Sequence, residues 1–267
     1  MLGMTTPISI EQIDAMCRPA ARQVAIRLVA ETGSTNTDLL DQLAQFSDPV
    51  LLIAESQTAG KGRAGRTWHS APGATLTFSL AWKFELPPQA LLGLPLATGV
   101  AITEALAQFG IEAKLKWPND ILRDGKKMGG ILIETASAKA GSAEVIWAVI
   151  GVGINMSVPA GLAALIDAPV AAAPALQVDR NRVLAALLNE LSEAMIRFEQ
   201  QGFSAFRDQW NALHAYAGQP VAILDRGQVL QEGTAAGVDD SGCLLLDTRQ
   251  GRIAVAAGDV SLRARGS

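Results

Sequence analysis

Residues 57–69, QTAGKGRAGRTWH, combine three glycines with the basic side chains of Lys61, Arg63 and Arg66. Glycine lets a backbone close around an anion, and arginine makes bidentate contacts with phosphate or carboxylate groups. The segment therefore predicts a flexible loop that binds an anion. The alternative is a solvent-exposed loop whose charges serve only solubility.

The glycine spacing in this loop matches the dinucleotide-binding fingerprint Gly-x-Gly-x-x-Gly, but its context does not. In that fingerprint the loop opens an amphipathic helix whose N-terminus holds the pyrophosphate. Here Pro72 and Gly73 follow before two helical turns could form, and the next predicted element is a strand. The sequence thus argues against a dinucleotide site, and it contains no Walker A motif.

A second polar cluster, KWPNDIL, occupies residues 116–122. Asp120 is a candidate ligand for Mg²⁺, and Asn119 has an amide suited to a base or ribose edge. An Asp-Gly pair at 124–125 predicts a hairpin, which would fold Lys127 back toward the carboxylate. The alternative is an exposed turn beside ordinary surface lysines.

Two shorter motifs, GSTN at 33–36 and GVGIN at 151–155, are weak when taken alone. The first suits a helix cap, and the second closes an apolar strand with two glycines and an amide. Together with the cationic loop and Asp120, they lie at predicted strand ends of one α/β unit. This combination predicts a nucleotide that is attacked at phosphorus.

The positioning elements are predicted from hydrophobic periodicity and turn residues. The first thirty residues are expected to hold a short amphipathic segment. A half-buried strand is expected at 75–82, with Leu76, Phe78, Leu80 and Trp82 on its buried face. Further strands are predicted at 50–55, 114–117, 121–123, 128–134 and 144–155, helices at 36–46, 91–110, 179–201 and 204–214, and an Ala/Pro-rich connection at 158–177.

From Pro220 onward only short strands and tight turns such as Asp225-Arg226-Gly227 are expected, which predicts a small all-β barrel. A boundary near Gly218 would divide the chain into a catalytic domain, 1–217, and a barrel, 218–267.

Composition narrows the class of protein. The 267 residues carry a net charge of −4, which argues against general binding to nucleic acid or membrane surfaces. Cys17 and Cys243 lie far apart in the sequence and lack neighbours at zinc-ligand spacing. The N-terminus does not resemble a signal peptide, and the uncharged stretch 86–103 contains prolines and a glycine that suit a buried helix. The expected compartment is the cytoplasm.

In their order and spacing, the motifs STN, QTAGKGRAGRTW, KWPND, KMGGILIE and GVGIN resemble the catalytic domain of biotin protein ligases, from about Glu31 to the closing GDVSLRA. The resemblance implies an α+β fold: a class II aminoacyl-tRNA-synthetase-like catalytic domain, with a mixed sheet flanked by helices, and a C-terminal SH3-like β-barrel. It also implies that the chain activates biotin with MgATP to biotinyl-5′-AMP and releases pyrophosphate. Biotin would then pass to a lysine of a biotin carboxyl carrier protein domain. Lipoate ligases share the fold but lack this combination of motifs.

The resemblance further implies roles for individual residues. Lys127 and Arg63 would act in catalysis, and Asp120 would hold Mg²⁺. Biotin would be bound by Ser34, Thr35, Asn36, Gln57, Lys61, Gly62, Arg63, Lys127, Gly151 and Ile154. ATP would be bound by Arg63, Arg66, Trp68, Lys116, Asn119, Asn155 and Arg263.

The sequence departs from the family pattern at two places. Lys61 replaces the usual first arginine of the loop, so the compact ammonium group of lysine takes the place of a planar guanidinium group. Only about thirty residues precede the catalytic domain, too few for the helix-turn-helix module of family members that act as repressors. We therefore expect a ligase without a nucleic-acid or membrane partner. The competing hypotheses are a related acyl-protein ligase and a sensor that binds the adenylate without transferring it.

Overall fold

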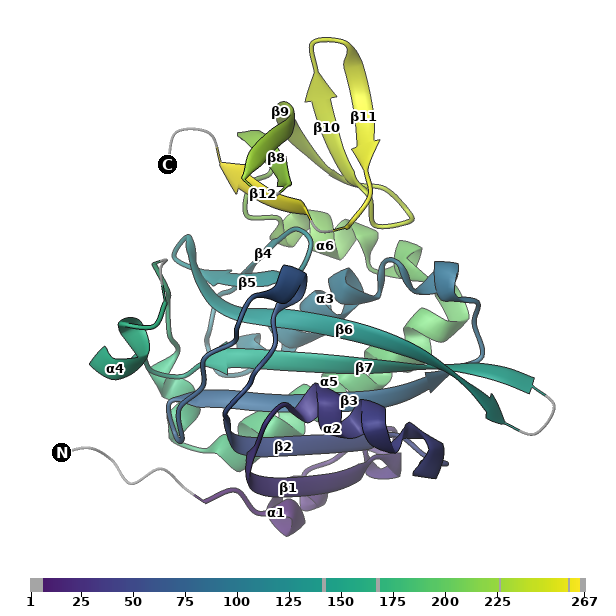
Figure 1. The fold of residues 1–267 in the computed structure, drawn as a ribbon, viewed down its shortest axis with the longest axis vertical. Coiled ribbons are helices and arrows are strands. Elements are labelled where there is room, and N and C mark those ends of the chain that lie inside the picture. Colours follow the sequence, from purple (N-terminus) through teal and green to yellow (C-terminus); the bar gives the residue numbers. More distant parts are fainter. Residues whose placement is uncertain (1–6, 141–142, 167–168, 226, 259, 265–267) are drawn as a thin grey trace.

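The computed structural model describes residues 7–140, 143–166, 169–225, 227–258 and 260–264. It contains a seven-stranded sheet in the order β1-β2-β3-β7-β6-β5-β4 and a five-stranded sheet in the order β11-β10-β9-β8-β12 (Figure 1). A mixed sheet with helices, followed by a small all-β unit, confirms the predicted fold class. Arg226 in a predicted turn and Asp259 in the closing motif lie outside the described residues.

The larger sheet is mixed because β1 and β2 pair in parallel, whereas its other neighbouring strands pair antiparallel. Its strands are β1 (Ala25–Thr32), β2 (Val50–Gln57), β3 (Thr75–Phe84), β4 (Lys114–Lys116), β5 (Asp120–Arg123), β6 (Lys126–Ala140) and β7 (Ala143–Asn155). All but β1 were predicted. The prediction for the first thirty residues omitted this edge strand, in which Ile26 and Leu28 alternate with the exposed Arg27.

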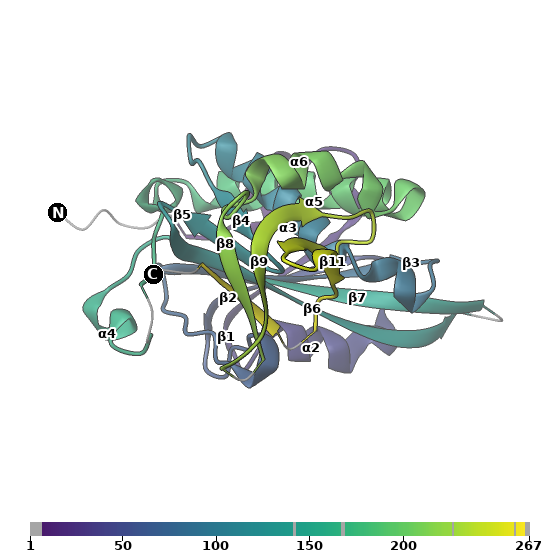
Figure 2. The same cartoon turned by 90° about the horizontal axis from the view of Figure 1, so that it is seen from above.

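Helices cover both faces of the larger sheet. Figure 2 shows α3, α5 and α6 on one side and α2 on the other. The α-helices are α1 (Ile10–Ala15), α2 (Thr35–Gln42), α3 (Leu94–Ala107), α4 (Ala160–Ala163), α5 (Arg180–Gln201) and α6 (Arg207–Leu213). Short 3₁₀ turns are η1 (Ala21–Gln23), η2 (Leu43–Gln45), η3 (Arg63–Gly65), η4 (Pro88–Leu91), η5 (Pro174–Gln177) and η6 (Phe203–Ala205).

Several predicted helix ends agree with the structure. Gly110 and Gly202, with φ of 69° and 67°, follow α3 and α5, and Asp179 caps α5 by accepting a hydrogen bond from the Arg182 amide. The segment Pro88–Ala107 is long and apolar enough to cross a membrane by length and composition. However, 72% of its most apolar window is buried, as in the core helix of a globular protein.

The prediction that β3 is half-buried was wrong. Thr75, Thr77 and Ser79, which alternate with its large apolar residues, are 0–1% exposed. The face that carries these small polar side chains is covered by α2 and by the chain around the site described below, so β3 is buried on both faces. This polar stripe therefore lies inside the protein.

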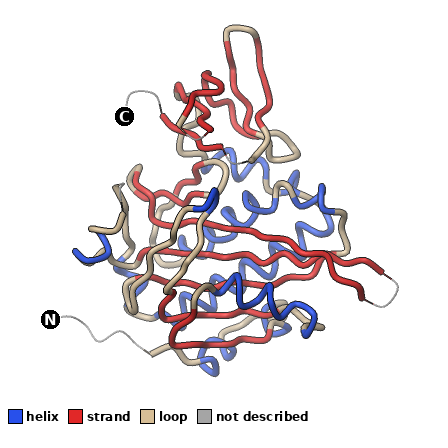
Figure 3. Tube along the Cα trace, in the orientation of Figure 1, coloured by secondary structure: helices blue, strands red, loops and turns tan. Residues whose placement is uncertain are grey.

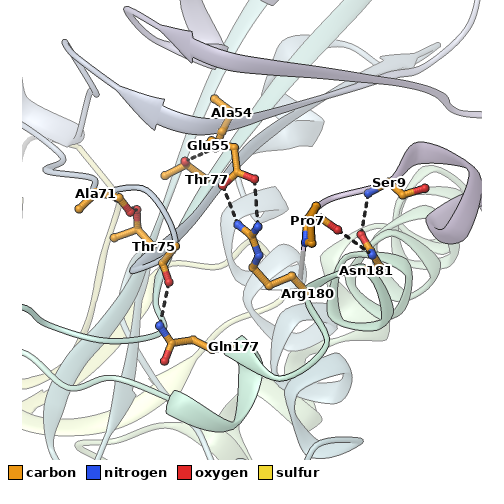
Figure 4. A network of polar contacts seen from close by, with 11 residues as sticks. Pro7, Ser9, Ala54, Glu55, Ala71, Thr75, Thr77, Gln177, Arg180 and Asn181 are labelled. Atoms are coloured by element: carbon orange, nitrogen blue, oxygen red, sulfur yellow. Dashed lines mark hydrogen bonds and ion pairs between the residues drawn. The ribbon is translucent and has the colours of Figure 1, made fainter. Parts of the chain in front are cut away.

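The start of α5 fixes the end of β2, two residues before the glycine loop (Figure 4). Arg180 is 4% exposed, and its guanidinium donates two hydrogen bonds to Glu55, at 2.6 and 3.0 Å. The neighbouring Asn181 donates to Pro7 O at 3.1 Å and accepts from the Ser9 amide at 2.9 Å. Bidentate pairs of this kind hold a fixed geometry, so the loop leaves the sheet from a rigid base.

Beyond α6 the described part of the chain forms only strands and loops (Figure 3). These strands are β8 (Pro220–Asp225), β9 (Gln228–Val238), β10 (Leu244–Thr248), β11 (Gly251–Val255) and β12 (Val260–Ala264). The buried Trp117 donates from Nε1 to Gly242 O at 3.1 Å, and the Val238 amide donates to Asn211 Oδ1 at 2.9 Å. These contacts fasten the small sheet beside the end of β4. The domain boundary near Gly218 stays a prediction.

Candidate active site

A cavity of about 670 Å³ lies where the glycine loop, the larger sheet and β12 meet. It is lined mainly by Ser34–Asn36, Gln57, Lys61–Ala64, Arg66–Trp68, Lys116–Asp120, Lys127, Gly130–Leu132, Gly151–Gly153, Tyr216 and Val260–Ala264. Segments separated by more than 200 residues in the sequence therefore share one wall. With two exceptions, every residue expected at the site lines this cavity.

The exceptions are Ile154 and Asn155, which do not lie among the lining residues of the described structure. Side chains alternate along a strand, so Ile154 points to the opposite face from its glycine neighbours and is fully buried in the main core. Asn155 lies beyond them and donates from Nδ2 to Ala171 O at 3.3 Å. We therefore leave both residues out of the site proposed below.

A floor of small polar side chains forms one end of the cavity. Gln57 Oε1 accepts a hydrogen bond from the Thr35 amide at 2.8 Å, which joins the end of β2 to the first turn of α2. Ser34 is the N-cap residue of α2, but its side chain makes no capping hydrogen bond. The hydroxyl of Ser34, 5% exposed and lining the cavity, is therefore placed to meet a ligand.

Two glycines of β7 make room for side chains that line the cavity. A Cβ atom at Gly151 would overlap Asn36 Oδ1, and one at Gly153 would overlap the Trp68 ring. Any larger residue would displace Asn36 or Trp68. The groups that approach these two glycines closely are therefore side chains of this chain.

A cationic pair surrounds a single carboxylate in the middle of the cavity. Lys127 Nζ lies 2.6 Å from Asp120 Oδ1, and Lys116 Nζ lies 3.2 Å from Asp120 Oδ2. Burial alone would raise the pKa of Asp120, but the two ammonium groups outweigh it, so this pKa lies below its usual value. Burial lowers the pKa of Lys116, an effect that Asp120 partly offsets.

A β-bulge brings Lys127 to this carboxylate. Asp120 pairs with Gly130, whereas Leu122 pairs with Lys127, so β6 has one more residue than β5 between these pairs. In a regular strand, residues three positions apart face opposite sides of the sheet, so the bulge is what lets Lys127 face the same side as Gly130 and Asp120. The predicted hairpin is confirmed by positive φ values at Asp124 and Gly125, but the hairpin alone does not set this orientation.

The glycine loop folds over the cavity as a small hairpin. The Gly62 amide donates to Arg66 O at 2.7 Å, and the Trp68 amide donates to Gly60 O at 2.8 Å. These amides are therefore used inside the loop and do not face an anion in this conformation. Arg63 is the loop side chain that reaches across: its Nη1 donates to Asn119 Oδ1 at 3.0 Å, and its Nη2 donates to Gly258 O in the small unit.

Three further residues belong to this region although none was expected at the site: Ser79 and Tyr216 lie outside the motifs, and Glu134 ends the KMGGILIE motif without an assigned role. Ser79 of β3 contacts Thr35 and Asn36, Glu134 of β6 accepts a hydrogen bond from Asn36, and Tyr216 lines the cavity near Asp120. The polar alternation of β3 was a signal for Ser79, but the sequence predicted that this face was exposed.

The donor atoms of the cavity limit which metal ion it suits. Among the described residues, no group of three or more His, Cys, Asp and Glu side chains could hold a metal ion. Asp120 is the one acidic residue in the described lining. Mg²⁺ is commonly held by one or two carboxylates together with substrate phosphates. The residues thus fit Mg²⁺ that arrives with a nucleotide rather than an ion held by protein ligands alone.

Comparisons with known proteins agree along most of the chain. Residues 28–155 match the biotin/lipoate A/B protein ligase family, and residues 216–263 match the biotin protein ligase C terminal domain. The biotin–[acetyl-CoA-carboxylase] ligase of Mycobacterium tuberculosis is 37% identical, over 87% of each chain. The bifunctional ligase/repressor BirA of Escherichia coli is 34% identical, over 84% of this chain and 69% of BirA.

A solved structure gives the same result for the fold. Biotin protein ligase from Aquifex aeolicus, in complex with biotin and ATP, is 29% identical with a TM-score of 0.73. The match covers 90% of this chain and 99% of that one.

Proposed function

This chain belongs to the biotin/lipoate A/B protein ligase family, and on that premise we propose that it acts as a biotin protein ligase through the cavity beneath its glycine loop. It activates biotin with ATP to biotinyl-5′-AMP, releases pyrophosphate and transfers biotin to a carboxylase. The observation that carries this function is the arrangement of the cavity. Lys127 and Arg63 approach its centre from two sides, and a neutral polar floor closes one end.

Biotin is placed with its cyclic urea at the floor and its carboxylate near Lys127. A urea has N–H donors and a carbonyl acceptor, so it needs both kinds of partner. Ser34, Thr35 and Gln57 supply hydroxyl and amide groups for this purpose. Apolar ring atoms would pack over Gly151 and Trp68, which line the adjacent wall.

In the first step, a carboxylate oxygen of biotin attacks the α-phosphorus of ATP. The new P–O bond forms as the bond to the pyrophosphate leaving group breaks. Two anions repel each other as they approach, and negative charge grows on the phosphoryl oxygens. Fixed cations in a partly dry site lower this barrier, which is the role we assign to Lys127 and Arg63. Mg²⁺, bound near Asp120 with the phosphates, would neutralise charge on the leaving group.

In the second step, the amine of an acceptor lysine attacks the carbonyl carbon of the mixed anhydride. The amide bond forms, AMP leaves with the electron pair of the broken bond, and the amine loses its proton. Water is a competing nucleophile, so the intermediate must be shielded. The loop that carries Arg63 covers the cavity and is tied to Asn119 and Gly258, which suits that role.

The finer assignments are also proposals. The nucleotide contacts Arg66, Trp68, Lys116, Asn119 and Arg263, and Lys61 and Gly62 lie over biotin. The acceptor is a lysine of a biotin carboxyl carrier protein domain, and the reaction takes place in the cytoplasm. The choice of acceptor and the closing of the glycine loop over the substrates are argued from the family to which this chain belongs.

The decisive experiment incubates a purified carrier domain with this protein, biotin and MgATP and measures the mass of the carrier. The mass is expected to increase by one biotinyl group, and only when all components are present. Exchange of labelled pyrophosphate into ATP isolates the first step and should depend on biotin. Exchange that depends on lipoate or octanoate but not on biotin would refute the proposed specificity.

A further inference from the structure

A chain of hydrogen bonds, here called the floor chain, lies under the polar floor and links β2 to β6. Thr35 Oγ1 is 3.0 Å from Gln57 Oε1 and 2.6 Å from Ser79 Oγ. Ser79 Oγ is 2.5 Å from Asn36 Oδ1, and Asn36 Nδ2 is 2.8 Å from Glu134 Oε2. The floor chain thus connects the cavity to a carboxylate that does not line it.

The geometry points to Glu134 as the positioning residue that sets the direction of every hydrogen bond in the floor chain and so the polarity of the floor. A carboxylate accepts hydrogen bonds and has no proton to give. The Asn36 amide must therefore turn its Nδ2 group toward Glu134, where Leu132 O, at 3.4 Å, is a second acceptor. Asn36 Oδ1 consequently faces Ser79.

The remaining directions follow from counting protons. Ser79 has one hydroxyl proton, and only a donated bond satisfies Asn36 Oδ1, so that proton is used there. The proton in the 2.6 Å contact between the two hydroxyls must then come from Thr35. Gln57 Oε1 already accepts from the Thr35 amide at 2.8 Å. With its proton turned to Ser79, Thr35 Oγ1 gives none to Gln57 Oε1, 3.0 Å away, so both oxygens keep lone pairs for the cavity that they line.

A floor of acceptors selects ligands that present N–H groups. This inference rests on the proposed function, because the cyclic urea of biotin is the part of the substrate that presents such groups at the floor. Glu134 does not touch the substrate in this arrangement. It acts through Asn36, Ser79 and Thr35, and its effect falls on binding of the vitamin rather than on phosphoryl chemistry.

The substitution Glu134→Gln keeps the side-chain shape but allows donation from residue 134. Asn36 is then free to reverse, after which its Nδ2 group donates to Ser79 and Ser79 donates to Thr35. The Thr35 proton would then turn to Gln57 Oε1, 3.0 Å away, which already accepts from the Thr35 amide, so the floor loses an acceptor for a ligand N–H. The KM for biotin is expected to rise by about tenfold to a hundredfold, the range for one unsatisfied hydrogen bond. The kcat of pyrophosphate exchange should not change.

The test measures biotin-dependent exchange of pyrophosphate into ATP for the wild type, E134Q, S79A and the double variant, with biotin affinity from calorimetry. S79A removes the hydroxyl through which Glu134 acts, so E134Q should raise KM no further in the S79A background. The matched control is Glu31→Gln. Glu31 accepts a hydrogen bond from Ser56 Oγ at 3.0 Å in the same sheet and does not line the cavity, so E31Q should leave KM unchanged.

An unchanged KM in E134Q, or effects of E134Q and S79A that multiply, would overturn the inference. Thermal unfolding midpoints equal to that of the wild type show that each variant is folded, and calorimetry measures biotin binding even where turnover is lost. The wild-type arm tests the proposed function separately. No biotin-dependent exchange there would overturn that function, whereas wild-type exchange with an unaffected E134Q overturns only the role of Glu134.

Discussion

Replacing Lys127 by alanine should abolish most adenylate formation while leaving the protein folded. The Lys127 ammonium, 2.6 Å from Asp120, is one of two cations that we place beside the reacting phosphate. Removing one group that stabilises transition-state charge raises a barrier by about 3–4 kcal/mol. A tenfold change in rate corresponds to about 1.4 kcal/mol, so exchange should slow by about two to three orders of magnitude.

The same substitution should change stability little. The Lys127 side chain is 36% exposed, and its partner keeps an ion pair with Lys116 at 3.2 Å. Solvent screens pairs of this exposure, so the free energy of unfolding should change by at most about 1 kcal/mol. Urea unfolding of wild type and variant measures this difference.

Lys126→Ala is the matched control for this variant. Lys126 is the preceding residue on the same hairpin, but it is exposed and does not line the cavity. Initial rates of biotin-dependent pyrophosphate exchange, at saturating biotin and ATP, compare the three proteins. The reasoning would be refuted if Lys127→Ala exchanged pyrophosphate as fast as Lys126→Ala.

Four other variants and conditions have expected outcomes. Arg63→Gly removes the bonds to Asn119 and Gly258, so more biotinyl-5′-AMP should escape and label bystander proteins, measured by streptavidin blotting. Gly151→Ala should displace the Asn36 side chain and raise the KM for biotin in the exchange assay. Burial lowers the pKa of His214 to about 4, so the unfolded chain takes up this proton first as the pH falls. Stability should therefore drop by about 3 kcal/mol between pH 6.5 and pH 4, measured by urea unfolding. Asp120→Asn should remove stability that is present at neutral pH and lost as the pH falls through the lowered pKa of Asp120, below its usual 3.8.

Each of these outcomes has a control. Gly161→Ala places its Cβ in open space, so it should leave KM unchanged, and an equal effect at both glycines would contradict the packing argument. In His214→Phe the free energy of unfolding should fall less between pH 6.5 and pH 4 than in the wild type. An unaltered fall would mean that other groups cause it. Bystander labelling by Arg63→Gly no greater than by the wild type would contradict loop shielding. Acid unfolding of Asp120→Asn that matches the wild type would contradict the pKa argument.

The sequence predicted the parts of the site that local chemistry determines. The glycine loop and the KWPND motif were expected to act together, and Arg63 contacts Asn119 across 56 residues of sequence. Turn residues also gave the hairpin at Asp124-Gly125, because few residues accept positive φ. Positions set by one short segment, or by the order of several motifs, could therefore be predicted from the sequence.

Positions that depend on pairing between strands could not be predicted from the sequence. The bulge that turns Lys127 toward Asp120 exists only once β5 and β6 are in register. The burial of Ser79 depends on α2, which a pattern of alternating residues does not reveal. Ile154 was assigned to the site as part of a motif, although period-two alternation from Gly151 places it on the other face. The edge strand β1 was missed because its alternation is short and its residues are partly exposed.

The cavity wall supplied by Val260–Ala264 means that the small sheet completes the site. A gene divided after the codon for Gly218 would encode two fragments that each carry an incomplete pocket. Biotin transfer would return only when the two fragments reassemble. If each fragment were fused to one of two interacting proteins, binding between those proteins would be recorded as covalent biotinylation.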